Sequence, residues 1–139
     1  MGKDNPIEYT EIIDFLKKVT GVSPNTLDTD IYNELGVVGD DFHELIDKYA
    51  ERFKIDMENY LWYFHCDEEG INIASLFFKA PYQRVKRIPI TPRKLLEFTK
   101  TKKWNINYPP HKIPKVRYDM IIGNIIVIIF VLTFLILVL

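Results

Sequence analysis

The stretch that decides the fold spans residues 35–55 and reads LGVVGDDFHELIDKYAERFKI. Asp41 and Glu44 have the Asp-x-x-Glu spacing of a capping box, which satisfies the free N–H groups at the start of a helix. Apolar residues then recur at helical spacing: Phe42, Leu45, Ile46, Tyr49 and Phe53. The outer face is acidic and consists of Asp40, Asp41, Glu44, Asp47 and Glu51. The stretch therefore predicts a helix with one buried and one acidic side.

Two further amphipathic helices are predicted on either side of it. Asn5-Pro6-Ile7-Glu8 has the residues of a helix start, and Tyr9, Ile12, Ile13, Leu16 and Val19 then follow on one face. Thr91-Pro92 begins another helix, with Leu95, Leu96 and Phe98 as its apolar positions. Residues 22–39 read as a long loop that Leu27, Ile31 and Leu35 anchor. The aromatic run 60–64 reads as a short helix or turn, and residues 71–78 could be extended.

The C-terminal stretch has a different composition from the rest of the chain. Residues 120–139 read MIIGNIIVIIFVLTFLILVL, without a charge, and 20 helical residues match the hydrocarbon thickness of a bilayer. His111, Lys112, Lys115 and Arg117 precede the span, so the positive-inside rule keeps the preceding residues in the cytoplasm. The lone Cys66 suits a reducing compartment. We expect a single-pass, tail-anchored protein of the cytoplasmic (inner) membrane.

Charge is distributed unevenly along the chain. Residues 1–70 hold 17 acidic and 6 basic residues, whereas residues 71–118 hold 12 basic residues and one acidic residue. We expect the basic half to balance the acidic half within the fold and to lie against the membrane. No nucleic-acid motif accompanies the basic residues. No spacing of Cys and His indicates a metal site, and no nucleophile has a visible base, so we expect no enzyme activity, cofactor or small-molecule substrate.

The residues quoted above carry a resemblance to known families. Leu35-Gly36, Glu44-Leu45 and the Glu51-Arg52-Phe53-Lys54-Ile55 ending resemble an acyl carrier protein. More closely, LDTDIYNELGVVGDDFHEL, the aromatic run and residues 91–104 resemble a bacterial carrier-like family catalogued as domain of unknown function 1493. The resemblance implies an acyl-carrier-protein-like helical bundle over residues 1–104. A Pro-rich basic linker over 105–118 and a transmembrane helix over 119–139 complete the predicted domains.

The sequence departs from carrier proteins at the residue that their chemistry requires. A carrier has a serine at the start of its second helix, where phosphopantetheine is attached, and alignment places Gly39 there. In carrier proteins the acidic face of that helix docks basic patches on partner enzymes. The resemblance therefore implies a non-enzymatic module, tethered to lipid by residues 119–139, that docks a protein partner through Asp40, Asp41, Glu44, Asp47 and Glu51. The alternatives are a carrier modified on another serine and a bacterial immunity or anti-toxin protein.

Overall fold

The computed structural model describes residues 7–139. Over this range the chain forms four α-helices and three short 3-10 helices, and residues 7–139 contain no strand, only a single bridge between Asp56 and Lys103. The elements are α1 (Tyr9–Thr20), α2 (Gly39–Phe53), η1 (Trp62–Phe64), η2 (Ile73–Leu76), η3 (Pro81–Arg84), α3 (Pro92–Thr101) and α4 (Tyr118–Val138). The prediction of a mainly α protein is confirmed.

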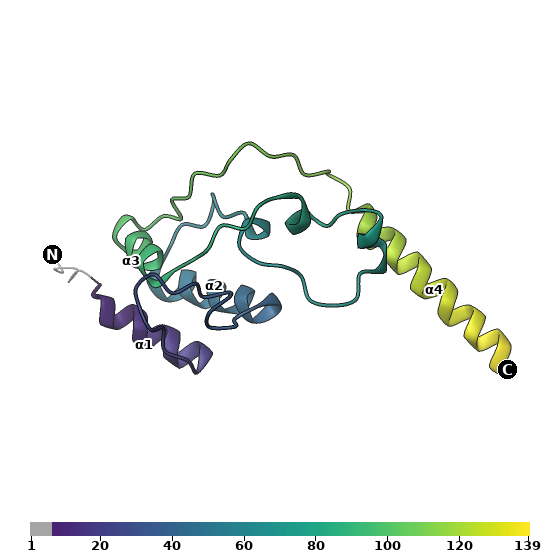
Figure 1. Cartoon of the computed structure of the whole chain (residues 1–139), viewed down its shortest axis with the longest axis horizontal. Coiled ribbons are helices and arrows are strands. Elements are labelled where there is room, and N and C mark those ends of the chain that lie inside the picture. The colour runs from purple at the N-terminus through teal and green to yellow at the C-terminus, as the bar shows by residue number, and fades with distance from the viewer. Residues whose placement is uncertain (1–6) are drawn as a thin grey trace.

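Helices α1, α2 and α3 lie together at one end of the molecule and enclose its core (Figure 1). All five apolar residues predicted for α2 are buried, together with Ile12 and Leu16 of α1 and Leu95 and Phe98 of α3. The hydroxyl of Tyr49 donates to the carbonyl of Leu95 at 2.6 Å, which satisfies a buried polar group and ties α2 to α3. Phe15 packs edge-on against Phe53, with ring centroids 5.4 Å apart.

The helix starts differ in part from the sequence expectations. Asn5 and Pro6 lie outside the described residues, and α1 begins at Tyr9 with Glu8 in the N-cap position. The capping box expected at Asp41 and Glu44 is wrong, because α2 begins earlier, at Gly39, after Val38. Asp40 and Asp41 fall in the first turn of α2, where their charge still favours the helix dipole. The start of α3 is confirmed, since the side chain of Thr91 accepts from the N–H of Lys94.

The loop between α1 and α2 is held by the C-terminal half of the domain. Ile31 is fully buried, as predicted for an anchor, and its N–H donates to the carbonyl of Ile90 at 3.0 Å. Arg87 and Arg93 form ion pairs with Asp30 and Asp28, at 2.5 and 2.7 Å. The basic half of the sequence therefore neutralises part of the acidic half within the fold.

The insert between α2 and α3 is helical wherever it is regular. The aromatic run contains η1, as predicted, but the extended segment considered for residues 71–78 is wrong because η2 occupies it. Asn72 explains the difference: its side chain accepts from the N–H of Ser75 and caps η2. The insert carries η2 away from the three-helix core to the start of α4 (Figure 1).

Residues 104–111 run back across the aromatic run. Trp104 is buried, and its indole N–H donates to the hydroxyl of Tyr108 at 2.9 Å. The ring of His111 lies 2.8 Å, nitrogen to oxygen, from the hydroxyl of Tyr63. These contacts attach the first half of the proline-rich stretch to the domain. Beyond it, α4 projects away from the core as an exposed apolar rod that is long enough to cross a membrane, with a mean hydropathy of 3.1 (Figure 1).

Candidate functional site

The acidic face of α2 is the surface that the sequence singled out, and the structure leaves it open. Its five members, Asp40, Asp41, Glu44, Asp47 and Glu51, are all exposed. Four of them lie at positions 40, 44, 47 and 51, which form one stripe along a helix. Glu44 contacts Lys48 of the same helix at 2.5 Å. The other four form no ion pair within residues 7–139.

Three carboxylates in loops, at positions 28, 30 and 68, have arginine partners. The guanidinium of Arg93 donates two hydrogen bonds to the carboxylate of Asp28, at 2.7 and 2.9 Å. These bonds hold the pKa of Asp28 below its usual range. Arg87 likewise donates two hydrogen bonds to the carboxylate of Asp30. Arg87, Arg93 and Arg117 thus pair with carboxylates outside α2, and none of them contacts the acidic face.

The N-terminus of α2 is closed by the segment that follows the aromatic run. Gly39 is buried and has φ +53°, a conformation that disfavours any residue with a Cβ. Its N–H donates to the carboxylate of Asp67 at 3.2 Å, so Asp67 does the capping that the sequence suggested for Asp41. A Cβ at position 39 would overlap the Cγ atom of Glu69. The position aligned with the carrier serine therefore has no side-chain oxygen, and a Cβ there would require the side chain of Glu69 to move.

The structure brings His43 and Cys66 together, a pair that the sequence spacing did not reveal. The Sγ atom of Cys66 lies 3.5 Å from Nε2 of His43, and it also contacts the carbonyls of Gly39 and Asp67. Burial and the neighbouring carboxylate of Asp67 raise the pKa of the Cys66 thiol to about 12. A thiol that stays protonated at neutral pH is a poor nucleophile, so this pair is a packing contact at the base of α2.

His65 is the second histidine that the sequence left unassigned, and it is fully buried. Its Nδ1 lies 2.9 Å from the carbonyl of Ile88, so Nδ1 carries the proton and Nε2 accepts from the hydroxyl of Tyr108 at 2.8 Å. That hydroxyl also accepts from the N–H of Leu61 and from the indole of Trp104. Burial lowers the pKa of His65 to about 4, because the charged ring would lose its hydration. His65 is thus a neutral structural residue.

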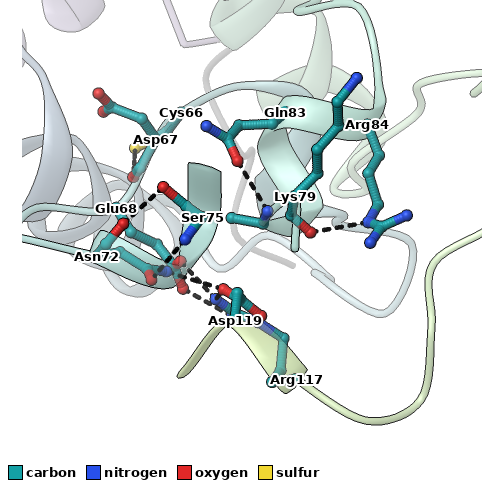
Figure 2. A network of polar contacts seen from close by, with 11 residues as sticks. Cys66, Asp67, Glu68, Asn72, Ser75, Lys79, Gln83, Arg84, Arg117 and Asp119 are labelled. Atoms are coloured by element: carbon teal, nitrogen blue, oxygen red, sulfur yellow. Dashed lines mark hydrogen bonds and ion pairs between the residues drawn. The ribbon is translucent and has the colours of Figure 1, made fainter. Parts of the chain in front are cut away.

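The start of α4 is clamped to the insert by a network centred on Arg117 (Figure 2). Arg117 donates twice to Glu68, at 2.8 and 2.9 Å, and twice to Asp119, at 2.6 and 2.9 Å. The side chain of Asn72 donates to Asp119 at 3.0 Å. The hydrogen bonds from Arg117 to Asp119 and to Glu68 raise the pKa of the guanidinium further. The network fixes the apolar helix to the soluble domain.

A cavity of about 380 Å³ lies between the start of α2, residues 68–73 and the first turns of α4. Asp40, the first member of the acidic face, lines this cavity together with Gly123 and Asn124 of α4. No group of three or more potential metal ligands occurs in the part of the chain that the structure describes. Because Asp40 and α4 line the same cavity, the acidic face begins beside the first turns of the apolar helix.

The three-helix core and the insert match a known protein family. The model for a protein of unknown function, DUF1493, matches residues 7–107. The chain belongs to the DUF1493 family. The matched residues include α1, α2, the insert, α3 and the whole acidic face, whereas Arg117 and α4 lie beyond them. The comparisons with curated proteins and with solved structures gave no match.

Sequence reasoning located the acidic face of this DUF1493 chain but missed the contacts that surround it. The expected residues Asp40, Asp41, Glu44, Asp47 and Glu51 share one exposed helix, as predicted. The capping of Gly39 by Asp67 spans 28 residues, and the clamp between Arg117 and Glu68 spans 49. The only local signal for either was the acidic cluster 67–69 beside Gly70, which reads as a turn in sequence.

Proposed function

We propose that the protein is a non-enzymatic interaction module, tethered to a membrane by α4, that docks a protein partner through the acidic face of α2. The observation that carries the proposal is the gathering of exposed carboxylates along one face of α2, most of them without an ion pair. Loop carboxylates at positions 28, 30 and 68 have arginine partners, but Asp40, Asp41, Asp47 and Glu51 have none within residues 7–139. A stripe of exposed carboxylates along one helix suits a partner with a basic patch.

The tether determines where that partner is found. The apolar, exposed α4 supports a single crossing of the cytoplasmic membrane, and Lys112 and Lys115 before it favour a cytoplasmic domain. Asp40 lines the cavity that α4 also lines, so the acidic face begins close to the bilayer. Confinement to a surface raises the local concentration of both proteins, and a weak contact between them then suffices. We therefore expect the partner to be a membrane protein.

The chain's geometry argues against the carrier alternative. Attachment of phosphopantetheine needs an accessible serine at the start of α2, and the aligned residue is Gly39, which is buried and has no side-chain oxygen. Ser75 instead donates its hydroxyl to the carbonyl of Asn72 at 2.6 Å, within η2. Incubation with a phosphopantetheinyl transferase is expected to leave the intact mass unchanged, and a mass increase of one phosphopantetheine group would establish the carrier reading instead.

Charge reversal with a matched control tests the docking proposal. The test variant carries Asp41→Lys, Glu44→Lys and Asp47→Lys. The control carries Glu11→Lys, Asp14→Lys and Glu58→Lys, which changes the net charge equally and also alters one acidic residue in a first helical turn. The full-length proteins are crosslinked in intact cells and captured from membranes.

We expect the control to retain the partner of the native protein and the test variant to lose it, with equal helicity by circular dichroism. The loss follows from like charges facing the basic patch of the partner. The same partner list from all three proteins would refute the docking role of the acidic face and make it an ordinary solvated surface.

A further inference from the structure

The segment around η2 exposes an unusual amount of apolar surface. The exposed fractions are 93% for Ile71, 82% for Leu76 and 81% for Phe77. Soluble proteins seldom gather large apolar side chains on an open surface without a use for them. These residues lie outside the core and outside the acidic face, and the proposed docking role does not involve them.

This segment lies against the first turns of α4. The ion-pair network in Figure 2 joins Asn72 to Asp119, and Ala74 packs at Gly123, where an added Cβ would lie 3.7 Å from the Cβ of Ala74. Phe78 and Tyr118 have ring centroids 6.3 Å apart. With a rise of about 1.5 Å per residue, Gly123 lies only about 4–5 Å below the first residue of the uncharged run, Met120. The segment is therefore level with the point where α4 would enter hydrocarbon.

Several backbone N–H groups of the segment are hydrogen-bonded within it. The N–H groups of Phe77 and Phe78 both donate to the carbonyl of Ala74, at 3.0 and 2.8 Å. The N–H and hydroxyl of Ser75 both bond to Asn72. Backbone groups that are satisfied within the chain cost little when water is removed. The turn of η2 can thus place its apolar side chains at a lipid boundary.

Charges next to the segment fit the surface of an anionic bilayer. Lys79 and Arg84 follow it, and both line a small hollow with Val116 and Arg117, directly before α4. Lys115 is exposed in the same stretch. Of the four carboxylates that line the cavity beside α4, Arg117 holds Glu68 and Asp119, whereas Asp40 and Glu69 have no ion pair within residues 7–139. Basic side chains next to exposed apolar side chains are typical of an element that lies in a membrane interface.

We infer that residues 71–79 form a second membrane contact, in which Leu76 and Phe77 enter the lipid interface beside α4 and Lys79 and Arg84 meet anionic headgroups. The occupant of this patch is the bilayer itself, because the patch is continuous with the exposed apolar surface of α4. Two contacts fix the orientation of a domain that a single helix would leave free to rotate. The acidic face then keeps a constant direction relative to the membrane. The inference rests on the proposal that α4 crosses the bilayer.

Site-directed spin labelling of the full-length chain in lipid nanodiscs tests the inference. Phe77→Cys carries the label in the interface, Val131→Cys carries it in the middle of α4, and Lys100→Cys carries it on exposed α3. The nanodisc lipids are phosphatidylethanolamine and phosphatidylglycerol, and no partner protein from the cell is present. Cys66 is buried, and its thiol has a pKa of about 12, so we expect it to take up little label. The unmutated chain, treated in the same way, measures any labelling of Cys66.

We expect the label at position 77 to collide with oxygen and to be shielded from a water-soluble nickel complex, as at position 131 and unlike position 100. Full nickel access at position 77, with position 131 shielded, would overturn the inference and leave the tether intact. Nickel access at both positions would overturn the tether as well. Shielding at position 77 in native membranes but not in nanodiscs would assign the patch to a protein partner and overturn the lipid contact.

A second variant tests the packing that positions the segment. Gly123→Leu places a bulky side chain where Ala74 meets α4, whereas Thr133→Leu adds a leucine farther along α4, away from η2. We expect Gly123→Leu to raise nickel access at position 77 and Thr133→Leu to leave it unchanged. Equal access at position 77 in both variants would show that the contact with α4 does not position the segment.

Discussion

The closed N-terminus of α2 gives a quantitative prediction, because two nearby glycines share a positive φ but differ in what surrounds them. Gly36 and Gly39 both have positive φ, +67° and +53°. An added Cβ at Gly36 meets nothing within 4 Å, whereas at Gly39 it overlaps the side chain of Glu69. The left-handed conformation costs a residue with a Cβ about 1–2 kcal/mol. Displacing Glu69 into an unfavourable rotamer adds about 0.5–1.5 kcal/mol.

Gly36→Ala is therefore expected to lower the free energy of unfolding by about 1–2 kcal/mol and Gly39→Ala by about 1.5–3.5 kcal/mol. Adding Glu69→Ala removes the overlapping atoms, so Gly39→Ala with Glu69→Ala should return to the Gly36→Ala value. Glu69→Ala alone serves as the control, and its exposed side chain predicts a change within about 0.5 kcal/mol.

Urea unfolding of the full-length protein in detergent micelles, followed by the fluorescence of buried Trp104, measures these differences. The reasoning fails if Gly39→Ala costs no more than Gly36→Ala, or if Glu69→Ala does not relieve the added cost. The first result would mean that the start of α2 is open, and the second that the added cost does not come from the side chain of Glu69.

Three further predictions concern the buried groups and the clamp. His65 has a pKa of about 4 in the folded protein against 6.5 when unfolded, so its contribution to stability is complete above pH 6.5. That contribution falls by up to about 3 kcal/mol as the pH drops to 4. Urea unfolding at several pH values should show this loss of stability, and His65→Gln should remove it. Arg117→Ala should weaken the attachment of α4 by about 2–3 kcal/mol and speed hydrogen exchange at Met120 and Ile121, whose N–H groups donate to the carbonyl of residue 117. Lys115→Ala, which breaks no ion pair among residues 7–139, should not, and equal protection in both variants would contradict the clamp. Cys66 should resist alkylation at pH 8 until the protein is unfolded, and rapid labelling of the native protein by iodoacetamide would contradict the burial of its thiol.

Local patterns in the sequence were sufficient for the helices. The apolar spacing of α2 named five residues that are all buried, and Thr91-Pro92 located the start of α3. These predictions hold because amphipathic spacing and capping depend on residues within one or two turns. Residues 71–78 were misread because an apolar run of that length is ambiguous, and the capping of η2 by Asn72 decided it.

The surroundings of the candidate site could not be read from the sequence, because they depend on contacts between distant residues. Asp67 replaces Asp41 as the cap of α2, and Tyr108 completes the hydrogen bonds of His65 from 43 residues away. Local propensity carries no information on such pairs. The acidic face itself was predictable because its members are neighbours on one helix. Whether those carboxylates had partners was not, since the arginines that pair with other carboxylates lie 49–65 residues away.

Direct contact at the acidic face is the central claim, and site-specific photo-crosslinking in intact cells tests it most directly. A photoreactive amino acid replaces Asp47, at the middle of the acidic face, or Lys100, an exposed residue of α3. The account predicts one discrete adduct with a membrane protein from position 47 and none from position 100. No adduct at position 47, or the same adducts from both positions, would contradict it.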